Sequence, residues 1–319
     1  MSEECSNPTC FVHVGESCSE GESDVNCCKH WAKKTHKEIN EPAELIKKPV
    51  RVPWSGSALG SSDLMNLTPR GRSILIGVLG AQNTGKTTLL TGNYLQLLRG
   101  KMVADATFAG SQTLGAWESL ASWARFDSTS PLASFPPHTP RGTERIPGLL
   151  HFALRNNNDE FRDVLLTDAP GEWFTRWSIE QNASDAVGAK WVVEHADAFL
   201  IFADCEKLSG SKRGQARSEL RQLIERLGNH VNNRPTTLVW AKNDQVPREG
   251  IVKAIRKALN ENIPHAVEVD TTIEKPESLT AALETVVSAT WSPPLSIPIF
   301  EPVVQTNPFA AFRGQYANT

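Results

Sequence analysis

The hydrophobic pattern between residues 72 and 291 alternates short apolar runs with longer amphipathic segments. Apolar runs rich in β-branched side chains are typical of buried strands, and leucines at helical spacing indicate helices packed against them. This alternation predicts an α/β fold, a mostly parallel sheet flanked by helices on both faces. The predicted strands are 74–79, 149–154, 164–167, 198–203, 236–240 and 266–269. The predicted helices are 86–99, 185–195, 213–227, 249–260 and 277–290.

The remaining segments differ in composition from this α/β domain, which we place at residues 73–292. Residues 1–31 are rich in cysteine, residues 32–72 are a linker by composition, and residues 293–319 form a Pro-rich tail without helical period. The hydrophobic fraction of 39% is low for a chain that is compact throughout, which is consistent with linker and tail segments outside the domain. Inside the domain, residues 100–147 form a long insertion after the first predicted helix, and a loop of that length usually has a function.

The linker carries four apolar residues with two possible roles. They form either one short amphipathic turn lying on the next domain or part of an extended connector, and the sequence leaves both open. The four residues are Trp54, Leu59, Leu64 and Leu67.

Charge and hydropathy narrow the class of partner. The chain has 33 basic and 36 acidic residues and a net charge of −3, so no overall field favours a nucleic acid or an anionic membrane. No apolar run approaches the roughly 18 residues of a membrane span, and the N-terminus lacks the basic and apolar regions of a signal peptide. We therefore expect a soluble, cytoplasmic protein.

The first predicted strand leads directly into G-x-x-x-x-G-K-T, a phosphate-binding loop. Gly80 and Gly85 let the backbone bend around a polyphosphate, and Lys86 reaches the terminal phosphates as a point charge. Thr87 is expected to bind Mg²⁺ through its hydroxyl. The residues whose backbone amides are expected to face the phosphates are Asn83, Thr84, Gly85, Lys86, Thr87 and Thr88.

A second element, D-x-x-G, follows the third predicted strand. Its Asp168 stands at the end of that strand, where a carboxylate can hold Mg²⁺ through a water, and Gly171 can offer its amide to the γ-phosphate. The order of the two elements is the one that a phosphate switch requires.

A third element, Ala241-Lys-Asn-Asp244, follows the fifth predicted strand and contains the K-x-D of a guanine-reading motif. Asp244 can accept hydrogen bonds from N1–H and the 2-amino group of guanine, a pair that adenine does not present. Lys242 belongs to the same base-binding element. Ala241 replaces the usual Asn or Thr, so a contact that normally tethers this loop to the phosphate-binding loop is missing or replaced.

Together the three elements resemble those of P-loop GTPases of the translation-factor-like class. The chain resembles, more closely, the bacterial double-GTPase proteins in its Cys-rich N-terminus and in the segments GAQNTGKTTLL, GSQTLGAWE, LLTDAPGEWFTRW, HADAFLIFADCEKLSG, LVWAKND and NPFAAFRG. These proteins are predicted components of conflict and defence operons. The resemblance covers most of the chain and implies a GTPase that works beside a second GTPase and an adaptor or effector encoded nearby.

The threonine that closes on Mg²⁺ in the GTP state should lie just before the second predicted strand. Thr143 fits best, Thr139 is next, and Thr113 is a more distant candidate.

Glu172 directly follows Gly171, where many GTPases carry a Gln that orients the attacking water. A carboxylate there can orient that water but also repels the γ-phosphate, so we expect slow intrinsic turnover. The sequence is equally consistent with a Glu172 that faces solvent, in which case catalysis would depend on a partner. Arg141 and Arg145 flank the candidate threonine, and either one is a candidate for an arginine finger in cis.

Three aromatic residues, Trp173, Phe174 and Trp177, follow D-x-x-G in the segment that should move when the γ-phosphate leaves. Bulky aromatics on a switch predict a partner surface; packing against the long insertion is the alternative.

The Cys-rich N-terminus predicts a small zinc module, because a segment so poor in apolar residues needs a staple to fold. In a reducing cytosol, clustered cysteines favour a metal over disulfides. Cys27 and Cys28 are adjacent, so at most one is expected to point at the metal. Free thiols and a redox role remain alternatives. The candidate ligands are Cys5, Cys10, Cys18 and one or both of Cys28 and His30.

The function that these observations predict is a GTP-binding and GTP-hydrolysing switch that uses Mg²⁺, carries Zn²⁺ and acts with a second GTPase or adaptor. The alternatives are a scaffold that binds GTP with little hydrolysis, and an ATPase or small-molecule kinase.

Overall fold

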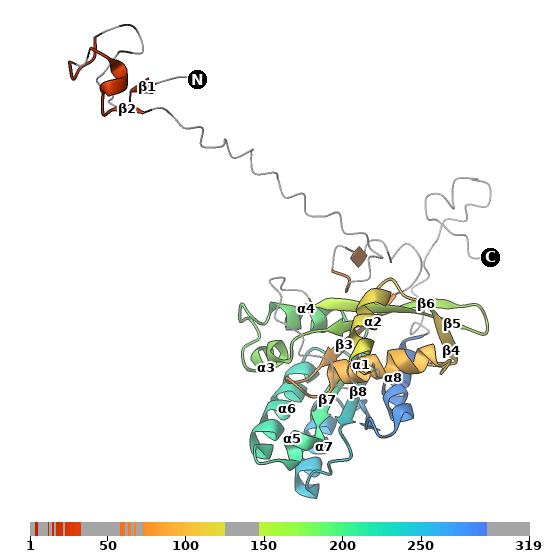
Figure 1. Cartoon of the computed structure of the whole chain (residues 1–319). Coiled ribbons are helices and arrows are strands. Elements are labelled where there is room, and N and C mark those ends of the chain that lie inside the picture. Colours follow the sequence, from red (N-terminus) through yellow and green to blue (C-terminus); the bar gives the residue numbers. More distant parts are fainter. Residues whose placement is uncertain are drawn as a thin grey trace. The chain divides into compact units, whose positions relative to one another are not determined.

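The computed structural model describes residues 4–5, 12, 15, 17–21, 23–32, 58–60, 63–64, 67, 73–124 and 147–291. The chain forms two compact units, Met1–Val52 and Pro53–Thr319, shown in Figure 1. Within the described part, no helix combines the length and the apolar character needed to cross a bilayer.

A mixed sheet organises the larger unit, and its described strands follow the order β4-β5-β6-β3-β7-β8-β9. Strand β3 lies at the centre and runs parallel to β6 and β7, and β8 and β9 continue the parallel part. At the other edge β5 is antiparallel to β6, and β4 is antiparallel to β5. The strands span Ser73–Leu79 (β3), Ala106–Gly110 (β4), Gly148–Asn156 (β5), Phe161–Asp168 (β6), Ala198–Asp204 (β7), Thr236–Ala241 (β8) and Val267–Thr271 (β9).

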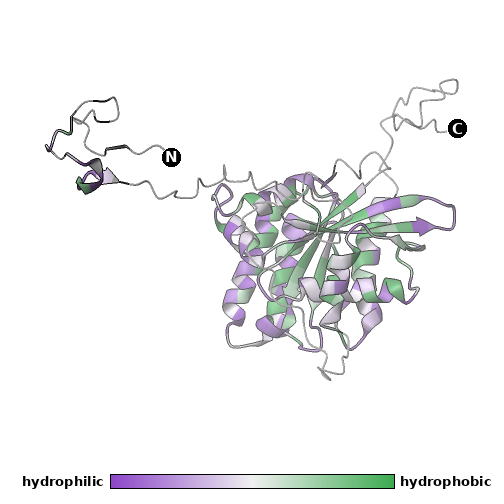
Figure 2. Cartoon of the chain, turned by 45° about the horizontal axis from the view of Figure 1, so that its top comes forward, coloured by the Kyte–Doolittle hydropathy of each residue, from purple (hydrophilic) through white to green (hydrophobic). Residues whose placement is uncertain are grey.

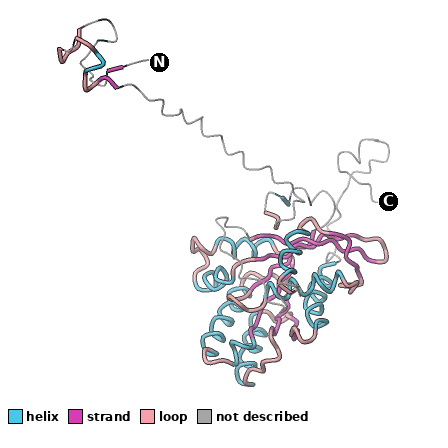
Figure 3. The backbone as a smooth tube through the Cα atoms, viewed as in Figure 1, coloured by secondary structure: helices cyan, strands magenta, loops and turns pink. Residues whose placement is uncertain are grey.

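Helices cover both faces of this sheet (Figure 3). One buried cluster joins one face to α1, α2 and α8, and a second joins the other face to α3, α4, α6 and α7. The strands are largely hydrophobic and the helices are amphipathic (Figure 2), which is the pattern of a sheet buried on two sides. The helices span Lys86–Leu98 (α1), Leu114–Ser122 (α2), Gly171–Ile179 (α3), Val187–His195 (α4), Cys205–Ser209 (α5), Arg213–Gly228 (α6), Glu249–Asn262 (α7) and Pro276–Trp291 (α8).

The predicted α/β class is therefore confirmed, and each predicted strand and helix has a counterpart in the structure. The first part of the insertion at 100–147 is not a continuous loop, because it contains β4 and α2. Its later part, residues 125–146, lies outside the described residues, as does the tail at 293–319.

Part of the predicted linker belongs to the larger unit. Leu59 forms an isolated antiparallel bridge with Leu149, and the two residues exchange backbone hydrogen bonds of 2.8 and 2.9 Å. Leu59 and Leu67 are buried in a core cluster, and Leu64 packs against it. These three leucines therefore pack on the α/β domain, as the first of the two alternatives predicts. Trp54 lies outside the described residues.

The N-terminal unit contains one small antiparallel pair, β1 (Glu4–Cys5) with β2 (Trp31–Ala32), and the 3-10 turn η2 (Val25–Cys27). Cys18, Cys27 and Cys28 form no disulfide within the part of the chain that the structure describes. No group of three or more His, Cys, Asp or Glu side chains able to hold a metal occurs among the described residues. Cys10 lies outside them, and only the backbone of Cys5 is described.

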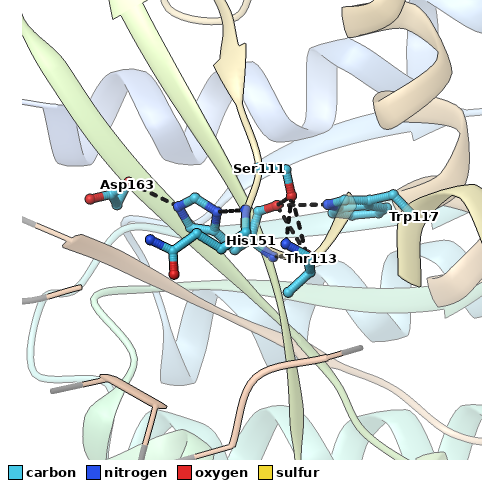
Figure 4. A network of polar contacts seen from close by, with 6 residues as sticks. Ser111, Thr113, Trp117, His151 and Asp163 are labelled. Carbon is cyan, nitrogen blue, oxygen red and sulfur yellow. Dashed lines mark hydrogen bonds and ion pairs between the residues drawn. The ribbon is translucent and has the colours of Figure 1, made fainter. Parts of the chain in front are cut away.

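A buried polar network attaches the β4–α2 segment to the sheet (Figure 4). The imidazole of His151 on β5 accepts the backbone N–H of Gln112 at Nδ1 (2.9 Å), so its Nε2–H donates to Asp163 on β6 (2.9 Å). The carbonyl oxygen of His151 accepts the indole N–H of Trp117 (2.7 Å), and the Thr113 hydroxyl bonds both backbone groups of His151. The network thus fixes α2 against β5.

We expect Trp117→Ala to lower the free energy of unfolding by about 3–5 kcal/mol, because it leaves a cavity where a fully buried ring packs. Trp117→Phe keeps a ring but loses the indole donor, so its effect should be smaller, about 1–2 kcal/mol. Urea denaturation measures both. Trp123→Ala is the matched control, since that ring is 45% exposed; equal destabilisation by the Trp117 and Trp123 truncations would contradict the assigned role of Trp117.

Candidate functional site

The loop between β3 and α1 adopts a backbone shape that its glycines and one asparagine permit. Gly80 (φ 156°), Asn83 (φ 60°) and Gly85 (φ 89°) all have positive φ. Gly85 is the N-cap of α1 and offers no side chain to the first-turn amides of that helix. These amides, together with the positive end of the helix dipole, form a site for an anion.

Lys86, the first residue of α1, is buried and folds back over its own loop. Its ammonium group donates to the carbonyl oxygens of Gly80 (3.0 Å) and Ala81 (2.8 Å). Burial lowers the pKa of Lys86 to about 8, although the nearby carboxylates of Asp168 and Glu172 oppose that change. A bound anion would stabilise this buried charge.

Thr87 and Asp168 come together at the same edge of the sheet. Thr87 lies in the first turn of α1 and Asp168 ends β6, the parallel neighbour of β3. The hydroxyl of Thr87 donates to the Asp168 carboxylate over 3.4 Å. A hydroxyl and a carboxylate at this separation are oxygen donors of the kind that Mg²⁺ prefers, so the two residues fit that ion.

Gly171, the first residue of α3, lies directly against the phosphate-binding loop. A Cβ added there would come within 2.3 Å of the backbone carbonyl carbon of Ala81 and the backbone nitrogen of Gln82. Only glycine fits at this distance, and α3 therefore begins in contact with the loop.

Lys242 connects the loop after β8 to the phosphate-binding loop. Its ammonium group donates to the carbonyl oxygen of Asn83 (3.1 Å) and to the carboxylates of Asp204 (3.0 Å) and Glu206 (2.7 Å). Burial pulls the pKa of Lys242 down, but the hydrogen bonds to Glu206 and Asp204 outweigh it and raise the pKa. These bonds tie the two loops together although Ala241 has no side chain that can do so.

Asp244 stands in the loop after β8 with its carboxylate held by two neighbours. It accepts hydrogen bonds from the Thr272 hydroxyl (3.2 Å) and the Gln245 amide (3.2 Å). The bond from Gln245 is the largest cause that lowers the pKa of Asp244, and the bond from Thr272 adds to it. The lowered pKa favours the ionised carboxylate, which can accept further hydrogen bonds.

Lys86 and Asp244 line the same cleft, whose volume of about 650 Å³ suits a small ligand. Lys86 and Thr87, which follow β3, line this cleft together with Lys242, Asp244 and Thr272, which follow β8 and β9. The cleft lies where the parallel strands end, which is where α/β sheets bind ligands.

The structure does not bring every predicted site residue into this cleft. Thr113, the more distant candidate for the threonine that closes on Mg²⁺, is fully buried, is bonded to His151 and does not line the cleft. Thr139, Arg141, Thr143 and Arg145 lie outside the described residues.

The aromatic run after D-x-x-G is not the exposed partner surface that was predicted. Phe174 is fully buried, and Trp177 is 1% exposed and stacks at an angle on His230 after α6. Trp173 packs against the same core cluster. The run attaches α3 to the body of the domain.

Four residues of the site were missed from the sequence. Asp204 is the last residue of β7, Glu206 and Lys207 lie on α5, and Thr272 follows β9. A usable signal existed for Asp204, because a carboxylate at the end of a buried strand falls at the edge where the phosphate-binding loop lies.

The chain matches a known protein family. A model of the family described as Double-GTPase 2 matches residues 74–291, which is more than half of the chain. No curated protein is significantly similar to the chain.

Gly171→Ala is expected to force α3 and the phosphate-binding loop apart, because the new carbon would overlap backbone atoms. We expect at least a tenfold loss of nucleoside-triphosphate affinity, or about 1.4 kcal/mol, measured by calorimetric titration.

Gly250→Ala is the matched control for this substitution. It also adds one carbon at a helical glycine, but nothing lies within 4 Å of the added Cβ. Unchanged affinity in both variants would mean that the contact between Gly171 and the loop does not position the site.

Proposed function

The chain belongs to the Double-GTPase 2 family, and from this premise we propose that it binds GTP in the cleft and hydrolyses it to GDP and phosphate with Mg²⁺. The observation that carries the proposal is the pairing of two chemistries in one cleft. The buried Lys86 and the hydroxyl of Thr87, which bonds the Asp168 carboxylate, share the cleft with the carboxylate of Asp244.

The phosphate end has the groups that a triphosphate needs. The groups that we propose to bind the phosphates are the ammonium group of Lys86, the backbone amide of Gly171 and the backbone amides of residues 83–88. Thr87 and Asp168 would hold Mg²⁺, Asp168 through a water. When bound, Mg²⁺ neutralises negative charge on the β- and γ-phosphates.

The base end has the groups that select guanine. Asp244 accepts from N1–H and from the 2-amino group, whereas adenine offers no such pair of donors. Thr272 and Gln245 hold the carboxylate in place for this contact. The aliphatic stem of Lys242 is proposed to cover the base while its ammonium group holds the two loops together.

Hydrolysis in this site depends on positioning and charge stabilisation. We propose that Glu172, in the first turn of α3 beside Gly171, orients the attacking water, and that its negative charge keeps intrinsic turnover slow. Thr143 is proposed to close on Mg²⁺, and Arg141 to stabilise the charge that develops as the bond breaks.

The family description suggests action alongside a second GTPase, and we propose such a partner or an adaptor in a bacterial conflict or defence system. Turnover measured alone and with the protein encoded next to this one would reveal whether the partner accelerates hydrolysis.

For the N-terminal unit we propose a structural Zn²⁺ bound by Cys5, Cys10, Cys18 and one or both of Cys28 and His30. The pairing of β1 with β2 supports it. Cys5 pairs with Trp31, whose backbone N–H donates to the carbonyl oxygen of Cys28 (2.9 Å), so the backbone of Cys5 lies beside the turn that carries the later ligands.

Protein purified without chelators should contain about one zinc per chain by plasma mass spectrometry, since four thiolate or imidazole ligands bind one ion. Cys18→Ser and Cys28→Ser should lower that content. Cys205→Ala is the matched control, because Cys205 is buried in the core of the larger unit and does not belong to the Cys-rich segment 1–31. A zinc-free wild type would exclude the module.

For the GTPase itself, we expect phosphate release from GTP but little from ATP, and loss of that release in Lys86→Ala. Asp244→Asn should weaken GTP binding by at least about tenfold and favour xanthosine triphosphate, because an amide offers one donor and one acceptor where xanthine presents an acceptor and a donor. Glu249→Gln, which removes an exposed carboxylate from α7, is the control.

Each other result points to a different function. Tight GTP binding without turnover would identify a scaffold, and preference for ATP would identify an ATPase or kinase. An unchanged base preference in Asp244→Asn would refute the assignment of the base end.

A further inference from the structure

Besides Lys86 and Lys242, a third lysine bonds the phosphate-binding loop, and it has no role in the function described above. Lys207, on the short helix α5, donates from its ammonium group to the carbonyl oxygen of Gln82. Its own backbone N–H donates to the carboxylate of Asp204 (3.3 Å), which caps α5. The base of the side chain is therefore fixed while its long stem reaches the loop.

Lys207 and Lys86 gather positive charge around one turn of backbone. Lys86 bonds the carbonyl oxygens of Gly80 and Ala81, and Lys207 bonds the next one, of Gln82. The two ammonium groups are close enough for Lys207 to contribute to the lowered pKa of Lys86. Backbone carbonyls are weaker partners for an ammonium group than an anion is, so an anion arriving between the two lysines would attract both.

The position of Gln82 identifies which part of a ligand this anion is. Gly171 rests on the backbone of Ala81 and Gln82, and Asp168 lies close to Lys86. Asp244 instead follows β8, which β7 separates from β3 in the sheet. In the proposed function, Gly171 and Asp168 stand at the γ-phosphate. A small crevice lined by Ala81, by Lys207 and by residues of α3 shares Thr84 with the cleft.

We propose that Lys207 is a further catalytic residue, which exchanges the Gln82 carbonyl for the γ-phosphate of bound GTP and stabilises its charge during hydrolysis. The inference rests on the proposed GTPase function and deepens it. Lys207 on α5 would supply in cis the cation that a second protein supplies to many GTPases.

The role of Lys207 in the reaction is electrostatic. The oxygen of water bonds to the γ-phosphorus, and the bond from that phosphorus to the β–γ bridging oxygen breaks. The electron pair of the broken bond stays on the β-phosphate of GDP, and the proton released by the water passes to inorganic phosphate or solvent. Lys207 contributes no atom; its ammonium group offsets negative charge on the transferring group, and its flexible stem lets it move there.

A purely structural role predicts a different pattern of effects. If Lys207 only braced the loop through the Gln82 carbonyl, its loss would weaken GDP and GTP binding together. If it contacts the γ-phosphate, its loss spares GDP, because GDP lacks that group.

The experiment compares wild type, Lys207→Met, Lys207→Arg and Lys212→Met in the full-length protein. Methionine keeps most of the apolar stem without the charge, arginine restores a cation, and Lys212 is an exposed lysine at the start of α6 and serves as the matched control. Single-turnover phosphate release gives the catalytic rate, and titration gives the affinities for GDP and for GTPγS.

We expect Lys207→Met to slow hydrolysis about 100-fold or more, as the loss of one transition-state donor does, with GDP affinity within about twofold and GTPγS affinity clearly reduced. Lys207→Arg should recover most of the rate, and Lys212→Met should equal wild type. Unchanged hydrolysis, an equal loss of GDP and GTPγS affinity, or a wild type that binds GTP without turnover would each overturn the inference. A wild type that binds no guanine nucleotide would instead refute the proposed function itself.

Discussion

The parallel pairing of β3 with β6 is the constraint on which the site depends. Because Ile76 pairs with Leu166, the two strands end at the same edge, and the elements that follow them meet there. This register brings the Thr87 hydroxyl to 3.4 Å from the Asp168 carboxylate and lets Gly171 lie against the phosphate-binding loop. A slip of one residue would turn Asp168 to the other face of the sheet and separate the pair.

The two lysines of the cleft show how burial and charge divide the site. Burial opposes a positive charge on both. At Lys242, the hydrogen bonds to Glu206 and Asp204 outweigh burial and raise the pKa, so the protein itself supplies the anions that this lysine bonds. At Lys86, burial prevails and the pKa falls to about 8 despite nearby carboxylates. Lys86 donates to backbone carbonyl oxygens, so a bound anion would stabilise its charge further.

The sequence predicted the sheet and its main helices because long apolar runs and leucine periodicity depend on local spacing. It missed β4, whose five residues alternate at an exposed edge, and α2 beside it, since both are short and belong to an insertion. The aromatic run of α3 was interpreted as a surface because its position suggested a switch. In the structure α3 packs against α4 and α6, so Phe174 and Trp177 are buried in the core.

By itself the sequence determined the phosphate-binding loop, Asp168, Gly171 and Asp244, because each belongs to a short motif whose residues act together as neighbours in the chain. Only the tertiary structure decided how the missing tether at Ala241 is replaced. Asp204, Glu206 and Thr272 are far in sequence from the residues that they hold, and they meet them only because parallel strands end at a common edge. No local pattern encodes such a meeting, since the long-range order of strands creates it.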